Sequence, residues 1–297
     1  MSTRPAGARR KRRNEAMRHS YQYAAAAAVL AGSLLAPALA NEPAPEVVNL
    51  PQPKSYQRIL TVNGQEVDAS ALPYAQGLPM RLIAEADHGN ALWLEEENES
   101  IFYLQGAQIR VNYGENTVSV GDTVLEGITA QVVDGVTFLP EAALAAVEGY
   151  TVDQNLALDV DRVDIITPNN APVVKLGYEL MEISNANANR TGLDLLEYYG
   201  INPESFTEAA AFFPMNISPD TLLVGRLADG SEEEVKAGLE AYRQQQADTF
   251  SWYLSQNLPK VEDAKLVVKD GWLLFVIAEH SDEAVTAFEA WVAAQNS

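Results

Sequence analysis

Carboxylates outnumber the other reactive side chains in this sequence, and three of them stand close together. Asp159, Asp161 and Asp164 are of the residue type that binds calcium. An EF-hand loop also needs Gly at its sixth position and Glu at its twelfth. Counted from Asp159, those positions hold Asp164 and Asn170. The spacing instead predicts outward-facing acids on a strand, where the side chains alternate between two faces.

A second acidic group, Glu95, Glu96, Glu97 and Glu99 around Asn98, is typical of a solvated loop. Weak calcium binding at extracellular concentrations stays open for this loop. Glycoside hydrolysis also stays open, because it needs only two carboxylates about 5 to 9 Å apart. The chain has 41 acidic residues, and the sequence alone selects no pair among them.

The three histidines are too scattered to form a site. His19 lies in the basic amino-terminal stretch, and His280 follows an expected strand. His88 follows an expected helix, where a cation is favourable, so we expect it to cap that helix. The chain has no cysteine, which excludes disulfides and cysteine-bound zinc or iron–sulfur clusters. No catalytic, cofactor-binding or metal-binding residue is assigned, and no cofactor is expected.

Four aromatic residues could line a carbohydrate or peptide groove: Trp252, Tyr253, Trp272 and Trp291. Their positions follow the periodicity of helices and strands, so we expect them in a hydrophobic core instead.

The first forty residues have the three parts of an export signal. A basic stretch runs to Arg18, an apolar stretch covers residues 24–36, and Ala38 and Ala40 provide small residues for a signal peptidase. The pattern predicts a signal peptide over residues 1–40. An uncleaved signal anchor is the alternative. Both place the rest of the chain outside the cytoplasm, secreted or associated with the cell envelope.

Charge limits the partners of the remaining chain. Seven of the 20 basic residues and one of the 41 acidic residues precede residue 41, so residues 41–297 carry a net charge of −27. This charge repels phosphate backbones and anionic lipid. Nucleic-acid partners are therefore not expected, and membrane contact is expected only through an uncleaved anchor.

Residues 41–55 are rich in proline and are expected to be a spacer, and residues 56–161 are expected to form the first domain. Short alternating stretches separated by Asn63-Gly64, Asp134-Gly135 and a turn over residues 114–116 predict β-hairpins. Helices are expected at residues 79–87 and 140–148, each opening with proline. They belong to a repeat in which strand, helix and strand recur at a constant offset, and we expect the two copies to pack together.

The repeat resembles a known family. The matching residues are Leu78-Pro79-Met80-Arg81-Leu82-Ile83-Ala84-Glu85-Ala86, Trp93, and Gly135-Val136-Thr137-Phe138-Leu139-Pro140. They are similar to the duplicated signature of the copper amine oxidase N-terminal-like, or stalk, domain. In the second copy Ala142 stands where the family has Arg, so a role of that Arg is implied only for Arg81.

The resemblance implies an accessory module without copper. Copper amine oxidases use three copper-binding histidines and a tyrosine that becomes the quinone cofactor. Outside the expected signal peptide this chain has only His88 and His280, and Asn112-Tyr113 is followed by Gly114. Amine oxidation is therefore excluded.

Residues 162–173 are expected to be a linker, and residues 174–297 a second domain. The pattern predicts helices at residues 191–199 and from 203, strands at 212–217 and 221–227, and a hairpin around Asp270-Gly271. Ser231 and Glu234 form a capping box for a long helix that extends to about residue 256. Ser281 is expected to cap a last helix.

This half resembles the bacterial domain of unknown function numbered four-three-five-eight. The matching segments are residues 196–204, Phe213-Pro214-Met215-Asn216-Ile217-Ser218, Phe250 with Tyr253, and residues 264–268 leading to Gly271. The resemblance implies an exported or membrane-attached bacterial protein and brings no activity with it.

The expected fold class is α+β with two domains: a duplicated strand–helix–strand, β-rich stalk domain and a small antiparallel sheet covered by helices. We expect an exported, non-enzymatic accessory protein of the bacterial cell envelope that binds a wall polymer or a protein partner. Two alternatives remain open. One is an extracytoplasmic hydrolase that uses carboxylates, and the other is an adaptor docked on a membrane complex.

Overall fold

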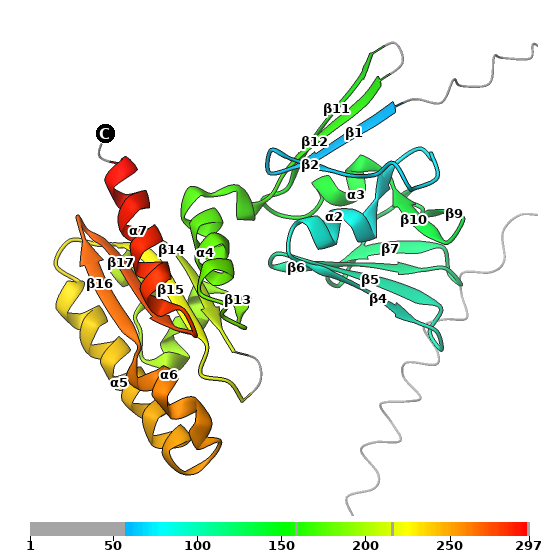
Figure 1. Cartoon of the computed structure of the whole chain (residues 1–297). Coiled ribbons are helices and arrows are strands. Elements are labelled where there is room, and N and C mark those ends of the chain that lie inside the picture. The colour runs from blue at the N-terminus through cyan, green and yellow to red at the C-terminus, as the bar shows by residue number, and fades with distance from the viewer. Residues whose placement is uncertain (1–56, 158–159, 215–216, 296–297) are drawn as a thin grey trace, which may run out of the picture. The chain divides into compact units, whose positions relative to one another are not determined.

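The computed structural model describes residues 57–157, 160–214 and 217–295. These residues belong to one compact unit of mixed helix and sheet (Figure 1). The expected signal peptide, the whole of the expected spacer, and Asp159 lie outside the described residues.

The first region contains three sheets around one core. A four-stranded sheet has the order β11-β12-β1-β2, with β1 (Gln57–Val62) parallel to β12 (Val160–Ile166) and antiparallel to β2 (Gln65–Val67). A small sheet has the order β3-β10-β9, and a five-stranded meander runs from β4 to β8. The remaining bounds are β3 Leu78–Pro79, β4 Asn90–Leu94, β5 Glu99–Leu104, β6 Ala107–Asn112, β7 Thr117–Val120, β8 Thr123–Val124, β9 Gln131–Val133, β10 Val136–Leu139 and β11 Thr151–Ala157.

The expected repeat is present. β3, α2 (Met80–Ala86) and β4 form one copy, and β10, α3 (Glu141–Ala145) and β11 form the other. The copies meet where Leu78 pairs with Leu139, and both leucines are buried in the same core. Helix α2 ends at Ala86 and is followed by His88 in the left-handed conformation (φ 59°). Gly89 lies close to β5, because a Cβ there would lie 2.1 Å from the carbonyl oxygen of Tyr103.

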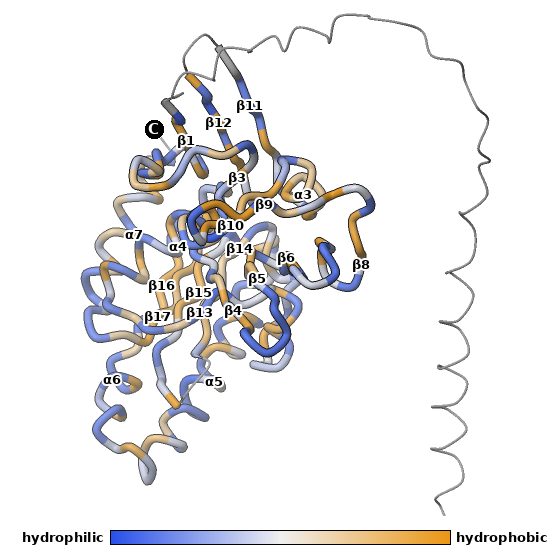
Figure 2. The backbone as a smooth tube through the Cα atoms, turned by 90° about the vertical axis from the view of Figure 1, so that its right-hand side faces the viewer, coloured by the Kyte–Doolittle hydropathy of each residue, from blue (hydrophilic) through white to orange (hydrophobic). Residues whose placement is uncertain are grey.

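The second region is a five-stranded antiparallel sheet with the order β13-β14-β15-β17-β16. Helices α4 (Pro172–Ile183) and α7 (Ser281–Gln295) cover one face, and α5 (Glu232–Trp252) packs on the other face (Figure 1). The strands are β13 Asn189–Thr191, β14 Phe206–Phe213, β15 Thr221–Leu227, β16 Lys265–Lys269 and β17 Trp272–Ile277. Figure 2 shows α5 mostly in hydrophilic colours, because only one stripe of it meets the sheet.

Several sequence expectations hold here. The strand expected at residues 221–227 is β15, and the hairpin around Asp270-Gly271 joins β16 to β17. Both turn residues have positive φ, 52° and 79°, which is the backbone that an Asp-Gly hairpin turn requires.

Other expectations about this region are wrong or hold only in part. The Ser231 side chain makes no cap hydrogen bond, because its hydroxyl donates to the carbonyls of Ser205 and Ala228. The helix expected at residues 191–199 is a 3₁₀ helix, η2 (Leu193–Tyr199), and near Pro203 only the short η3 (Pro203–Ser205) forms. The strand expected at 212–217 begins earlier, at Phe206.

The segment expected to be a linker is ordered. β12 continues to Ile166, η1 covers Pro168–Asn170, and α4 begins at Pro172. Val163 and Ile165 are buried in the core of the first region, and Val173 is buried in the core of the second, so this segment supplies core residues.

Candidate functional site

A groove of about 620 Å³ opens in the first region between α2, the meander and the β9–β10 hairpin. We call it the Trp93 groove. Its lining is mostly apolar with a few polar groups, as in ligand-binding grooves, and consists of Leu72, Pro79, Arg81, Leu82, Glu85, Trp93, Asn98, Ser100, Phe102, Tyr113, Val132, Gly135, Val136 and Thr137.

Strand pairing places the aromatic side of this groove. Trp93 on β4 lies opposite Ser100 on β5, and Ala91 lies opposite Phe102. Directly opposed residues share a face of a sheet, so Trp93, Ser100 and Phe102 point to the same side. Phe102 is buried in the core, whereas Trp93 at the edge of the sheet is 46% exposed. The groove therefore has a fixed floor and an accessible indole.

Tyr113 joins the sheet to the hairpin. Its ring centroid lies 5.7 Å from that of Trp93, with the two rings tilted by 55°. Its hydroxyl donates to Ser100 Oγ at 3.0 Å and shares a 2.5 Å hydrogen bond with Thr137 Oγ1. These bonds hold the β10 wall against the meander and so preserve the opening between them.

Helix α2 provides the charged rim of the groove. Arg81 and Glu85 lie one turn apart, with Nη1 and Oε1 separated by 3.9 Å, and both side chains are more than half exposed. A loose, exposed pair of this kind contributes little to stability and leaves both groups free to meet a ligand. Glu85 is the one carboxylate in the lining.

The comparisons with known proteins find a family model that matches this region. Residues 61–158 match the copper amine oxidase N-terminal domain. The stalk resemblance inferred from the repeat is thus confirmed, and the whole lining of the Trp93 groove lies within the matched residues. Residues 181–278 match a second family model, Domain of unknown function (DUF4358). No curated protein and no solved structure shows a significant match to the chain.

The acids considered for calcium that belong to the described residues do not come together. Asp161 is fully buried and accepts two hydrogen bonds from Arg58, so the expectation that it faces outward is wrong. Asp164 lies on the opposite face of β12 and pairs with Arg162. Asp161 and Asp164 are an odd number of residues apart, and strand alternation therefore separates them. Glu99 lies on β5 and accepts bonds from Arg110 and Asn112, while Glu95, Glu96 and Glu97 are exposed.

His88 does not act as the expected cationic cap. Its imidazole stacks on Tyr178 of α4, with ring centroids 3.6 Å apart and the planes 9° from parallel. Burial lowers the pKa of His88, although the neighbouring Asp87 carboxylate opposes this shift. The neutral imidazole is therefore favoured. His280 is exposed, and its backbone N–H donates to the carbonyl of Ser184.

Asp87, which ends α2, is a buried polar centre that the sequence did not indicate. Its side chain accepts hydrogen bonds from Asn63, Tyr150, Thr167 and Asn169. The residue is 2% exposed, so these bonds replace its hydration. Burial and the bond to Asp87 raise the pKa of the Tyr150 phenol. Asp87 thereby fixes η1 against the core of the first region.

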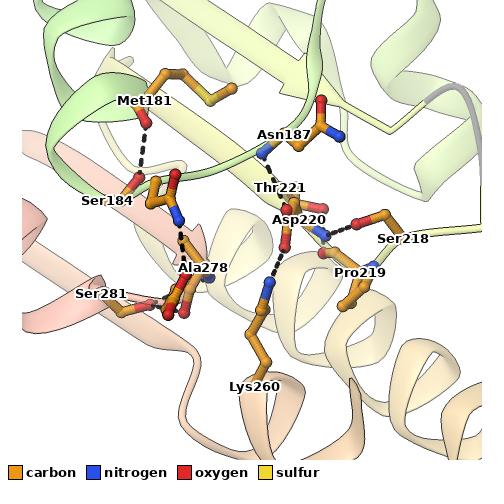
Figure 3. A network of polar contacts seen from close by, with 12 residues as sticks. Met181, Ser184, Asn187, Ser218, Pro219, Asp220, Thr221, Lys260, Ala278 and Ser281 are labelled. Carbon is orange, nitrogen blue, oxygen red and sulfur yellow. Dashed lines mark hydrogen bonds and ion pairs between the residues drawn. The ribbon is translucent and has the colours of Figure 1, made fainter. Parts of the chain in front are cut away.

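Asp220 forms a similar centre in the second region (Figure 3). Its two carboxylate oxygens accept hydrogen bonds from the backbone N–H of Asn187 at 2.9 Å and from Lys260 Nζ at 2.7 Å. Next to it, Thr221 Oγ1 lies 2.9 Å from the hydroxyl of Tyr242, and burial raises the pKa of Tyr242 to about 12. These contacts join β15 to α5 and to α6 (Leu258–Glu262), which is a structural role.

The aromatic residues expected in a core separate into two groups. Trp272 is buried and packs edge-on against Trp291 at 4.7 Å, as expected. Trp252 is 80% exposed and Tyr253 is 44% exposed, so the expectation is wrong for them. Helix α5 ends at Trp252, and its periodicity no longer applies beyond that residue.

Among the described residues, no group of three or more His, Asp or Glu side chains is arranged to hold a metal ion. Within the same residues, no helix combines the length and apolar character needed to cross a bilayer.

Trp93 and Arg81 belong to the family signature in the sequence, whereas no sequence signal placed Ser100, Tyr113 and Thr137 in one site. The last two lie 24 residues apart along the chain. Only the packing of the hairpin on the meander brings them together.

Proposed function

We propose that this chain is an exported, non-enzymatic accessory protein of the bacterial cell envelope, with a stalk domain followed by a second α+β domain. It binds a wall polymer or a protein partner through the Trp93 groove. The observation that carries the proposal is the half-exposed Trp93 beside a pre-formed groove with an accessible Arg81 and Glu85. Pre-formed, mostly apolar grooves with a few polar groups are typical of ligand sites.

Among wall polymers, an uncharged glycan fits this groove best. The C–H faces of a sugar ring are apolar and pack on indole and phenol rings such as those of Trp93 and Tyr113. Asn98 and Arg81 at the rim offer hydrogen-bond donors to sugar hydroxyls. The net charge of −27 on residues 41–297 disfavours polymers rich in phosphate.

A sedimentation assay with insoluble peptidoglycan tests the groove. Trp93→Ala should weaken binding at least tenfold, because a buried aromatic anchor contributes about 2 kcal/mol or more to an interface. Trp252→Ala is the matched control, since Trp252 is also an exposed indole but lies outside the groove.

The control variant should bind like the parent protein, and teichoic-acid preparations should bind more weakly than peptidoglycan. Failure of the parent protein to sediment with peptidoglycan, or equal losses in both variants, would contradict the glycan assignment.

A binding role is favoured over hydrolysis by the lining of the groove. The hydrolytic mechanism needs a pair of carboxylates, and the lining contains only Glu85. Incubation with peptidoglycan should therefore release no reducing ends. If the parent protein releases reducing ends and Glu85→Gln does not, the alternative, an extracytoplasmic hydrolase, would be established.

Export is supported by the tripartite pattern of residues 1–40. Mass spectrometry of the mature protein should find Asn41 at the amino terminus. A retained amino-terminal segment in the membrane fraction would favour an adaptor docked on a membrane complex. Full-length protein found only in the cytosol would overturn the proposal.

A further inference from the structure

Strand β4 is a free edge of the five-stranded meander. It pairs with β5 along all five residues without a bulge, and no described strand pairs with its other side. The backbone N–H of Ala91 donates to the side chain of its neighbour Asn90 at 2.8 Å, which places this amide on the open side. Backbone amides of alternate residues in an antiparallel strand point to the same side, so the amide of Trp93 also lies on the open side.

This edge lacks the protection that the other edges of the described sheets have. Proteins normally guard a free edge with shortness, charge, proline or a bulge. β2, β3, β8, β9 and β13 have three residues or fewer. The longer edge strands carry charged side chains, Asp153 on β11 and Lys265 and Lys269 on β16. β4 has the sequence Asn-Ala-Leu-Trp-Leu, with neither charge nor proline.

The side chains of β4 are also suited to contact. Leu92 is 43% exposed and Trp93 is 46% exposed. They are neighbours in a strand and therefore point to opposite faces. A strand added beside β4 would cover apolar surface on both faces of the sheet.

The charges around this edge are mainly negative. Glu95, Glu96 and Glu97 follow β4 directly and are exposed. Glu85 and Arg81 on α2 border the groove on the Trp93 face and lie within 3.9 Å of each other, so their charges partly cancel. The complementary partner is basic.

We propose that β4 accepts an added strand from a partner protein, and that this strand is an extended segment in which apolar and basic residues alternate. Its backbone pairs with Trp93 and with Ala91, whose N–H exchanges its exposed bond to the Asn90 side chain for a bond to the added strand. Its apolar side chains pack on Leu92 or Trp93, and its basic residues face the Glu95–Glu97 turn. A second copy of the chain fits less well, because residues 41–297 of each copy carry a net charge of −27 and the copies repel each other. The inference goes beyond glycan binding, since it uses the backbone edge and Leu92, which is not part of the groove lining.

The test uses residues 41–297 and a capped eight-residue peptide of alternating valine and lysine. On binding, amide hydrogen exchange should slow at Ala91 and Trp93, where the open side of β4 becomes paired. It should stay unchanged at β8, the opposite edge of the same sheet. A peptide of alternating valine and glutamate should bind at least tenfold more weakly.

Leu92→Lys should weaken binding of the lysine peptide at least tenfold, because it places a cation on the edge strand. Val124→Lys on β8 is the matched control, because Val124 is 56% exposed at the other edge, and it should bind like the parent. Leu92→Lys should also keep the Trp93-dependent sedimentation with peptidoglycan, which separates failure of this inference from failure of the glycan assignment.

Unchanged exchange at Ala91 and Trp93 with saturating peptide would overturn the inference. Equal binding of the glutamate peptide would do the same. Light scattering that shows a dimer in the parent and a monomer in Leu92→Lys would replace the partner strand with a second copy of the chain.

Discussion

Replacing Arg58 with alanine should destabilise the fold far more than replacing Arg162, although both arginines pair with an aspartate of β12. Asp161 is 0% exposed, and Arg58 approaches its Oδ2 with Nε at 2.9 Å and Nη2 at 2.6 Å. Arg58 also donates to the backbone carbonyls of Ala75 and Gly77. The Arg162–Asp164 pair lies at the surface, with side chains 52% and 35% exposed.

The magnitude follows from burial. Removing one partner of a buried pair leaves an uncompensated charge and costs about 3–5 kcal/mol. Arg58→Ala should therefore lower the free energy of unfolding by that amount in urea titrations followed by circular dichroism. Arg162→Ala should shift the urea midpoint only slightly, because water screens that pair.

A double variant makes the test sharper. Arg58→Met combined with Asp161→Leu removes both charges and should be more stable than Arg58→Ala, since no buried carboxylate is left alone. A loss below about 1 kcal/mol in Arg58→Ala, or equal losses for Arg58→Ala and Arg162→Ala, would refute the reasoning, because about 1 kcal/mol is the upper range of an exposed pair.

Two further predictions concern helices α2 and α4. Burial lowers the pKa of His88 below its ordinary 6.5, so its stabilising effect is complete above about pH 6.5 and is lost as pH falls through the lowered pKa. Melting temperatures between pH 7 and pH 5 should fall less steeply in His88→Asn, which tolerates the positive φ, and an unchanged slope would contradict this. Gly177→Ala should lower the melting temperature despite the better helix propensity of alanine, because the new Cβ would lie 2.6 Å from Phe212 Cε2. Glu179→Ala on the exposed side of α4 is the control, and equal stability of the two variants would count against the packing of α4 on β14.

Local signals predicted much of the fold. The Asn63-Gly64, Asp134-Gly135 and Asp270-Gly271 pairs all adopt positive φ at hairpin turns, because these residue types tolerate that backbone at low cost. The repeat was also visible, since Leu78 and Leu139 occupy equivalent core positions. Such features depend on a few neighbouring residues.

Features that depend on distant segments were missed. Helix α4 follows Pro168 and begins at Pro172, so proline and asparagine suggested a linker, while the sheet that α4 covers is formed by residues far along the chain. Asp161 was expected at the surface because local sequence patterns show no partner for it. Its partner Arg58 lies 103 residues away along the chain. Trp252 fits a helical stripe, but the helix ends there and leaves the indole in solvent.

The candidate site was predicted in part. Trp93 and Arg81 belong to the family signature, whereas Tyr113 was considered only as a cofactor precursor. Its bonds to Ser100 and Thr137 depend on the packing of β10 against the meander. The open edge of β4 depends on the strand order, which the sequence did not indicate.

The most direct test of the groove is a nuclear magnetic resonance titration of residues 41–297 with soluble glycan strands of peptidoglycan. The chain has four tryptophans, and each gives one indole N–H signal, which Trp→Phe variants assign. The signal of Trp93 should shift with the glycan concentration, while those of Trp252, Trp272 and Trp291 stay in place. No shift at Trp93, or an equal shift at Trp252, would contradict ligand binding in the groove.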